Sequence, residues 1–329
     1  MPLPSYSRPW YLCNGHFETI WPSLFRKVEP PLYRRERINT TDEDFLDLDW
    51  LNSGHKRLAV ISHGLEGDSR RHYVAGMANA LAADGWDVLA WNFRGCGGEI
   101  NRRPRFTHNG ATDDLDDVVR HALKKYNYST ISLVGFSMGG NLTLVYLGRD
   151  SDRVPVEVKA AVCFSVPCDL AAASMRLAES GNLVYMRRFI RLMGQKIRLQ
   201  AKRFPNQFPC AGYRKIKTFH DFDGRYTAPL HGFRDAQHYW EECSSKRYLD
   251  AVRIPAWIIN ARNDPFLTPD CFPDSNHHGN LCVKLVAPDH GGHCGFTPIG
   301  KHPQYWSETV AISLLSAFPS RQATVLEPS

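Results

Sequence analysis

The sequence predicts an α/β protein: a mostly parallel, doubly wound sheet with antiparallel N-terminal strands and a helical cap insertion. Short apolar runs alternate with segments of helical periodicity, as in parallel strands joined by helices. Before them the chain has the pattern of a hairpin. The alternation stops for the 90 positions between Val166 and Ala256, where a simple crossover needs only one helix and two short loops. We therefore predict a core formed by residues 1–166 and 251–329, with a cap inserted at 167–250.

The first strands are predicted to be antiparallel. Leu46, Leu48 and Trp50 alternate with two aspartates, which is typical of a half-buried strand. The polar residues 39–43 separate this strand from residues 34–38 and favour a hairpin turn.

The parallel strands are predicted from apolar runs without alternation, because such strands are covered on both faces. These runs are 58–62, 86–93, 131–136, 159–166, 256–261 and 282–287. Helical spacing of apolar residues predicts helices over 74–81 and 115–122. A closing helix over 304–318 follows from the same pattern between Pro303 and Pro319.

The predicted cap is strongly basic. Residues 176–225 hold 12 Lys or Arg and 3 acidic residues, whereas the rest of the chain has a net charge of −3. An amphipathic stretch carries Met186, Ile190 and Met193 on one face and Arg187 and Arg191 on another. The simplest interpretation is a solvated helix face, and the alternative is a surface with weak attraction to anionic lipid membranes or a cover over an acyl-chain pocket.

The composition narrows the class of protein. No run reaches the roughly 18 apolar residues of a membrane span, and the first residues lack the apolar core of a signal peptide. The nine cysteines show no CxxC spacing, which favours reduced thiols and a cytoplasmic location. Because the positive charge is confined to one segment, we expect no nucleic-acid partner.

The strongest chemical motif is Gly135-Phe-Ser-Met-Gly-Gly140, between a predicted strand and a predicted helix at 141–147. In such a sharp turn, small residues let the backbones approach while the central serine is held with its hydroxyl exposed. The alternative is a merely structural glycine-rich turn. The strand and helix on either side favour a catalytic nucleophile at Ser137.

A serine hydroxyl needs a base, and the base needs an acid that orients it. Asp264 follows the predicted strand 256–261, and His293 follows the predicted strand 282–287. Serine, acid and histidine then occur in the order expected for a nucleophile on this type of turn. Asp289 and His290 are nearby alternatives, and we prefer His293 because the glycines near it leave room for the ring.

Acyl transfer also needs hydrogen-bond donors for the oxyanion. We expect the amide of Met138, which follows the nucleophile, and the amide of Leu65, which lies in the glycine-flanked loop 63–67 after an early strand.

Two other clusters favour structural interpretations. A Cys/His-rich segment lacks the spacing of a compact zinc site; its members are Cys271, His277, His278, Cys282, His290, His293 and Cys294. Residues 94–98 are glycine-rich but lack the lysine and serine of a phosphate-binding loop, so we predict a tight turn beside the active site. We predict no metal and no cofactor.

Several motifs together resemble those of the YheT-like α/β-hydrolases, a family that includes abhydrolase-domain esterases or lipases and yeast medium-chain ethyl-ester enzymes. The similarity covers nearly the whole chain and rests on residues 14–20, 63–67, 92–96, 135–140, 264–266 and 290–293. It implies the α/β-hydrolase fold and a carboxylic-ester hydrolase without a cofactor, with nucleophile, acid and base at Ser137, Asp264 and His293. Gly97, Phe17 and Glu18 depart from the family pattern, and we expect none of them to affect the chemistry.

The sequence thus predicts a serine carboxylesterase for short- to medium-chain acyl esters, acting on a small ester or a lipid-like substrate. One alternative is an acyltransferase in which an alcohol replaces water. Others are a lipase or phospholipase and, from a different class, a non-catalytic binding module. An intact set of Ser137, Asp264 and His293 argues against the binding module.

Overall fold

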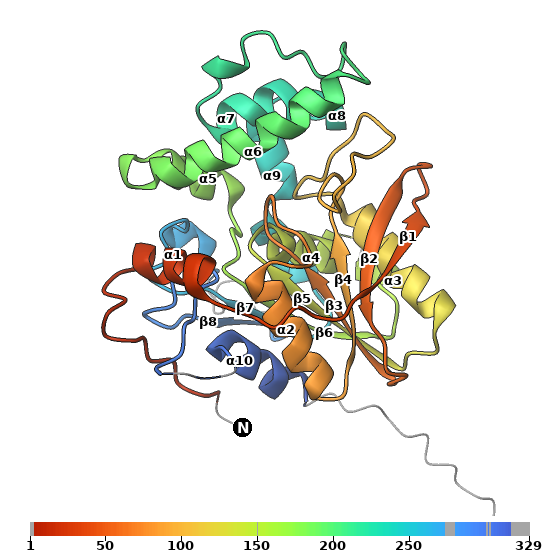
Figure 1. Ribbon diagram of the computed structural model, residues 1–329, viewed down its shortest axis with the longest axis vertical. Coiled ribbons are helices and arrows are strands. Elements are labelled where there is room, and N and C mark those ends of the chain that lie inside the picture. The colour runs from red at the N-terminus through yellow and green to blue at the C-terminus, as the bar shows by residue number, and fades with distance from the viewer. Residues whose placement is uncertain (1–2, 150, 274–279, 301, 303, 317–329) are drawn as a thin grey trace, which may run out of the picture.

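The structure, a computed structural model, describes residues 3–149, 151–273, 280–300, 302 and 304–316. Its strands form one sheet in the order β1-β2-β4-β3-β5-β6-β7-β8 (Figure 1). The strands are β1 (Arg34–Asn39), β2 (Phe45–Leu51), β3 (Arg57–Ser62), β4 (Asp87–Asn92), β5 (Thr130–Phe136), β6 (Val158–Phe164), β7 (Ala256–Ile259) and β8 (Val283–Val286). The β1–β2 and β2–β4 pairs are antiparallel and the other pairs are parallel, which confirms the predicted fold class.

Helices cover both faces of the sheet, as expected for a doubly wound arrangement. One face packs against α3 (Thr112–Lys125) and α4 (Met138–Arg149), and the other packs against α2 (His72–Ala83) and α10 (Trp306–Leu315). The closing helix α10 is shorter than the predicted range 304–318. Of the three predicted residues beyond Leu315, Ser316 caps the helix and the last two lie outside the described residues.

The segment 167–250, which was predicted to be a cap and keeps that name here, lies between β6 and β7 and contains a group of helices. Figure 1 shows them together above one end of the sheet. They are α5 (Leu170–Ala178), α6 (Leu183–Ala201), α7 (Phe219–Phe222), α8 (Ala228–His231) and α9 (Ala236–Cys243). Met186, Ile190 and Met193 on α6 are buried in an apolar cluster, whereas Arg187 and Arg191 are exposed, so the predicted amphipathic helix is confirmed.

Two strands differ from the expected burial. The predicted half-buried strand β2 is buried over both faces, because Arg35 and Arg37 on β1 form ion pairs that cover Asp49 and Asp47. The strand β8 was expected to be covered on both faces, but it lies at the edge of the sheet and is partly exposed.

The helix α1 (Gly15–Phe25) was not predicted. It begins where the side chain of Asn14 accepts a hydrogen bond from the amide of Phe17, a standard N-cap. Among the described residues, none of the helices combines the length and apolar character required to cross a bilayer.

Candidate active site

Ser137 stands on a strained turn between β5 and α4. Its φ is +53°, a left-handed value that is uncommon for residues other than glycine. The turn is possible because the residues two positions before and after Ser137 are glycines: a Cβ on Gly139 would overlap the carbonyl oxygens of Ser62 and His63, and one on Gly135 would lie 2.5 Å from Cα of Gly140. The sequence therefore folds here into a turn that presents the serine hydroxyl at the carboxyl end of the sheet.

The structure brings the three predicted residues into one hydrogen-bonded chain. Nε2 of His293 lies 2.9 Å from Oγ of Ser137, and Nδ1 of the same ring lies 2.8 Å from Oδ2 of Asp264. Asp264 is buried, and its Oδ1 accepts a hydrogen bond from the amide of Phe266 at 2.9 Å. The ring of Phe266 packs on the imidazole with a centroid distance of 4.2 Å. Both the acid and the base are thus held in one orientation.

The two nearby alternatives point elsewhere. Asp289 is exposed and lies 3.6 Å from Arg262. Nδ1 of His290 lies 3.7 Å from a carboxylate oxygen of Glu18 and 3.4 Å from Nδ2 of Asn263. His293 is therefore the histidine that contacts Ser137.

The loop that was predicted to supply an oxyanion donor runs directly against the nucleophile. A Cβ on Gly64 would lie 3.2 Å from Cβ of Ser137, and both Leu65 and Met138 line the same pocket as Ser137. His63 fixes this loop: its Nε2 accepts from the amide of Phe93 at 3.1 Å, and its Nδ1 lies 2.7 Å from the carbonyl of Gly64. Complete burial lowers the pKa of His63 to about 3, which keeps the ring neutral.

The helix α1 holds together the two loops that carry Asp264 and His293, a role that the sequence analysis missed. Glu18 is fully buried. Its carboxylate accepts hydrogen bonds from the amide of Gly291 and from Nδ2 of Asn263, which precedes Asp264. The sequence analysis expected no effect of Glu18 on the chemistry, and its contacts with both loops assign it a positioning role that was not predicted. Burial raises its pKa, and the two hydrogen bonds oppose that shift.

Further contacts tie the same loops to α1 and to each other. Oγ1 of Thr19 accepts from the amide of His293 at 2.9 Å. Oδ1 of Asn263 accepts from the amide of Gly292 at 3.1 Å, and the carbonyl of Asn263 lies where a Cβ on Gly15 would be. In the sequence, this role was indicated only by the motif at residues 14–20. The spacing of apolar residues does not reveal what that motif does.

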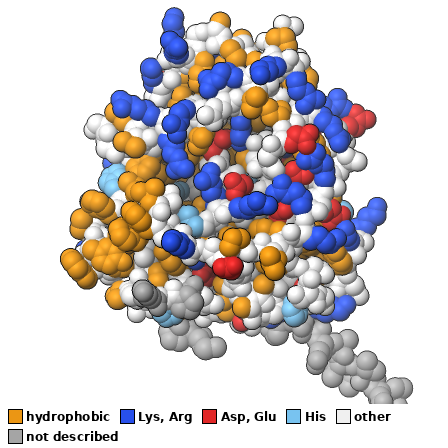
Figure 2. All heavy atoms as spheres, viewed as in Figure 1, with side chains coloured by type: hydrophobic (Ala, Val, Ile, Leu, Met, Phe, Trp, Pro, Cys, Tyr) orange, Lys and Arg blue, Asp and Glu red, His pale blue; other side chains and the backbone are white. Residues whose placement is uncertain are grey.

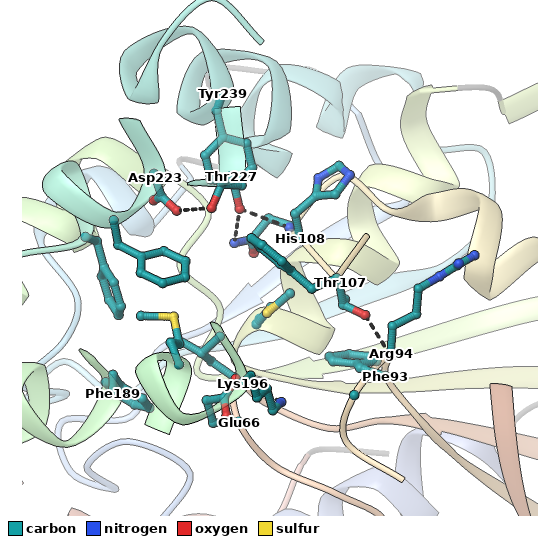
Figure 3. Close-up of a pocket in the computed structure, with 18 of the residues that line it drawn as sticks. Glu66, Phe93, Arg94, Thr107, His108, Phe189, Lys196, Asp223, Thr227 and Tyr239 are labelled. Atoms are coloured by element: carbon teal, nitrogen blue, oxygen red, sulfur yellow. Dashed lines mark hydrogen bonds and ion pairs between the residues drawn. The ribbon is translucent and has the colours of Figure 1, made fainter. Parts of the chain in front are cut away.

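A pocket of about 150 Å³ opens beside Ser137 between the core and the cap (Figure 3). Its wall is mostly apolar and comes largely from cap helices. The cap residues include Leu170, Ala173, Leu177, Phe189, Met193, Ile197, Phe208, Phe219 and Phe222. Such a wall suits the hydrocarbon part of a substrate.

The charged side chains of the pocket wall are held by neighbours. Nζ of Lys196 lies 3.0 Å from a carboxylate oxygen of Glu66 and 3.0 Å from Sγ of Cys96. Asp223 accepts hydrogen bonds from Thr227 at 2.6 Å and from the indole of Trp240 at 2.9 Å, and burial raises its pKa to about 6. Figure 3 shows Asp223 and Lys196 on opposite sides of the pocket.

The glycine-rich segment at 94–98 forms a turn on the pocket wall, as predicted. Its Arg94 is buried and makes ion pairs with Asp42, Asp44 and Asp114. The guanidinium therefore links this turn to the β1–β2 turn and to α3, and it is not directed at a phosphate.

The Cys/His-rich segment is only partly described, because His277 and His278 lie outside the described residues. Within the described part of the chain, no three His, Cys, Asp or Glu side chains are grouped as metal ligands. Cys294 is half-buried, and its amide donates to Oγ of Ser165.

Comparison with known proteins gives consistent matches. Residues 60–297 match the family model described as the alpha/beta hydrolase fold. The chain is 32% identical to YheT of Escherichia coli strain K12, over 90% of this chain and 88% of that protein. It is 31% identical to phospholipase ABHD3 of Mus musculus, over 85% of this chain and 73% of that protein.

Solved structures show the same fold. An esterase of Pyrococcus furiosus, Pf2001, superimposes with a TM-score of 0.58 at 21% identity. The match covers 89% of this chain and 98% of that one.

Proposed function

From the premise that the chain belongs to the α/β-hydrolase family, as an esterase- or lipase-type enzyme, we propose that it hydrolyses carboxylic esters through an acyl-enzyme on Ser137. The observation that carries this proposal is the hydrogen-bonded chain from Ser137 through His293 to Asp264, at the edge of an apolar pocket.

The geometry supports the usual sequence of steps. His293 carries its proton on Nδ1, which donates to Asp264, so that Nε2 is free to accept the proton of Ser137 as Oγ attacks the ester carbonyl. The amides of Leu65 and Met138 donate to the oxyanion of the tetrahedral intermediate. The leaving alcohol takes the proton from His293. His293 then accepts a proton from water as the water oxygen attacks the acyl-enzyme, and it returns that proton to Oγ of Ser137 when the bond between Oγ and the acyl carbon breaks and the acid leaves.

The pocket supports short- to medium-chain acyl groups. A cavity of about 150 Å³ holds a group the size of benzene, which corresponds to roughly six carbon atoms. We propose that residues 167–250 act as a cap over this pocket and that the nine free thiols reflect a reducing, cytoplasmic location. The exposed arginines of α6 support weak attraction to anionic membrane surfaces.

Two related activities use the same residues. In an acyltransferase an alcohol would replace water at the acyl-enzyme, so that added ethanol would give more ester than acid. A lipase or phospholipase would prefer long-chain, aggregated substrates over small soluble esters.

The test combines a covalent label with turnover. We expect a fluorophosphonate to add once to the purified wild-type protein and not to Ser137→Ala, as read by intact mass. Ser129→Ala, at an exposed serine just before β5, is the matched control and should be labelled like the wild type. Turnover of p-nitrophenyl esters of increasing chain length should be highest near six carbons. A wild-type protein that is neither labelled nor active would instead support the non-catalytic binding module.

A further inference from the structure

A broad apolar surface covers the outer face of α1 and the segment before it. We call it the α1 patch. Its members are Trp10, Tyr11, Phe17, Ile20, Leu24 and Phe25, with exposed fractions from 39% to 89%. Figure 2 shows this surface as a continuous apolar area on the side of the molecule where α1 lies in Figure 1. A contiguous exposed apolar area of this kind is typical of a surface that binds another molecule or a membrane.

The patch is continuous and its scaffold is fixed. The rings of Trp10 and Tyr11 have centroids 5.9 Å apart, Tyr11 and Trp21 are 5.3 Å apart, and Trp21 and Phe25 are 4.4 Å apart. The opposite face of α1 is held by Glu18 and by the ion pair between Arg26 at its end and Glu308. The apolar side chains are thus held outward by a rigid helix.

A basic surface adjoins the patch. The cap helix α6 touches α1 where Tyr185 lies 3.2 Å from Nδ1 of His16 and stacks on its ring. Arg188 is three residues further along α6, on the same side of that helix, and is exposed, as are Arg187 and Arg191. Figure 2 shows Lys and Arg side chains above the apolar area, while the acidic side chains visible on this face lie mainly elsewhere.

We propose that the α1 patch inserts into the surface of an anionic lipid membrane, with the arginines of α6 placed over the headgroups. Tryptophan, tyrosine and phenylalanine beside leucine and isoleucine are the side chains that lie at a membrane interface, and adjacent arginines add attraction to anionic lipid. A second copy of the chain fits this surface less well, because pairing the same face twice brings like-charged arginines together.

This docking connects the membrane to the proposed catalytic site. The helix that carries the patch also holds the loop of His293 through Thr19. Tyr185, which contacts α1, packs on Phe266 beside the imidazole. A membrane bound at the α1 patch would therefore lie against the helix that holds the loop of His293. The docking itself does not depend on catalysis.

The test is co-sedimentation with vesicles of phosphatidylcholine alone or of phosphatidylcholine and phosphatidylglycerol at 3:1. The full chain should bind the anionic vesicles, and the triple variant Phe17→Ser, Leu24→Ser, Phe25→Ser should bind at least tenfold less. The double variant Leu32→Ser, Val156→Ser removes exposed apolar side chains outside the patch and should bind like the wild type. Arg188→Gln with Arg191→Gln should weaken binding to anionic vesicles only.

Several outcomes would overturn the docking proposal. They are wild-type protein that stays in the supernatant with both vesicles, binding that is unchanged in the triple variant, and a wild-type dimer in solution that the triple variant abolishes. Fluorophosphonate labelling of Ser137 in every variant reports whether the protein is folded. Because labelling and vesicle binding are separate readouts, failure of docking leaves the ester-hydrolase proposal intact.

Discussion

The core and the cap contribute to the site in different ways. In the core, the course of the backbone positions the side chains of the site. Ser137, Asp264 and His293 each follow a strand, and parallel strands end at the same edge of the sheet. In the cap, the side chains determine the shape of the pocket, since its part of the wall is assembled from apolar residues on the long helix α6 and on several shorter segments. This difference implies that changes in the core affect the rate of the chemistry and the stability, whereas changes in the cap affect which ester is accepted.

The largest effect should come from Asp264→Asn. An asparagine would present its amide group to Nδ1 of His293 or favour the wrong tautomer, so kcat should fall by about 10⁴-fold for a short p-nitrophenyl ester. Asp289→Asn, at the exposed neighbouring aspartate, should keep kcat within twofold of the wild type. A decrease of less than tenfold in Asp264→Asn would remove this residue from the mechanism.

A smaller but still large effect is expected on stability at the nucleophile turn. Gly139→Ala places a methyl group against the backbone of Ser62 and His63, which cannot move without disturbing β3. The free energy of unfolding in urea should fall by about 3 kcal/mol. In the cap, a Cβ on Gly181 would meet nothing within 4 Å. Gly181→Ala should therefore change the free energy of unfolding by less than about 0.5 kcal/mol. Equal effects at the two glycines would contradict the contrast between core and cap.

One buried histidine in the core and one in the cap allow the pH dependence of stability to be compared between these two regions. Burial lowers the pKa to about 4 for His72 on α2 and for His231 on α8. Because the unfolded chain binds a proton at each histidine below pH 6.5 and the folded chain does not, each should cost about 2 kcal/mol of stability between pH 6.5 and pH 5.

The measurement is urea unfolding of wild type, His72→Gln and His231→Gln at both pH values. Comparing each variant with the wild type cancels the opposite contribution of carboxyls such as Asp114, whose pKa is raised to about 6 by burial. Each variant should recover about 2 kcal/mol of the loss on acidification. If the cap unfolds separately, His231→Gln will change only one of two transitions.

The next effect concerns a residue that acts through others. Glu18→Gln replaces an oxygen that accepts from Asn263 or Gly291 with an amide group that can only donate, so one of the two loops must shift. We expect kcat to fall about tenfold, a loss of roughly 1.4 kcal/mol, with little change in KM. Glu29→Gln, at an exposed glutamate, is the control. An increase in KM at constant kcat would instead indicate a role in substrate binding.

The sequence predicted which side chains lie together where their position follows from strand order, and it missed those whose position depends on distant contacts. The strand ends placed Ser137, Asp264 and His293 without any knowledge of the tertiary structure. Glu18 could not be found in this way, because its contact with Gly291 spans 273 positions. Burial of β2 was missed for a related reason: alternating aspartates look solvent-exposed until the arginines of β1 are placed beside them.

The cap was predictable only as a set of helices. The amphipathic pattern identified the buried face of α6, but the pocket also needs Phe208, Phe222 and Phe266, which lie in separate segments. The α1 patch was missed because the helix itself was not predicted, and an apolar residue in a sequence is ordinarily assigned to the core.

The smallest expected effect tests whether the α6 face sets the acyl-chain length. Ile197 is buried and lines the pocket, and Ile197→Val removes one methyl group from that wall. A chain one methylene longer should then gain about fourfold in kcat/KM relative to the original optimum, which corresponds to roughly 0.8 kcal/mol. Ile190→Val is the matched control, because this isoleucine is buried on the same helix but is not part of the pocket wall. If both variants shift the preference equally, or neither does, chain length is selected elsewhere in the cap.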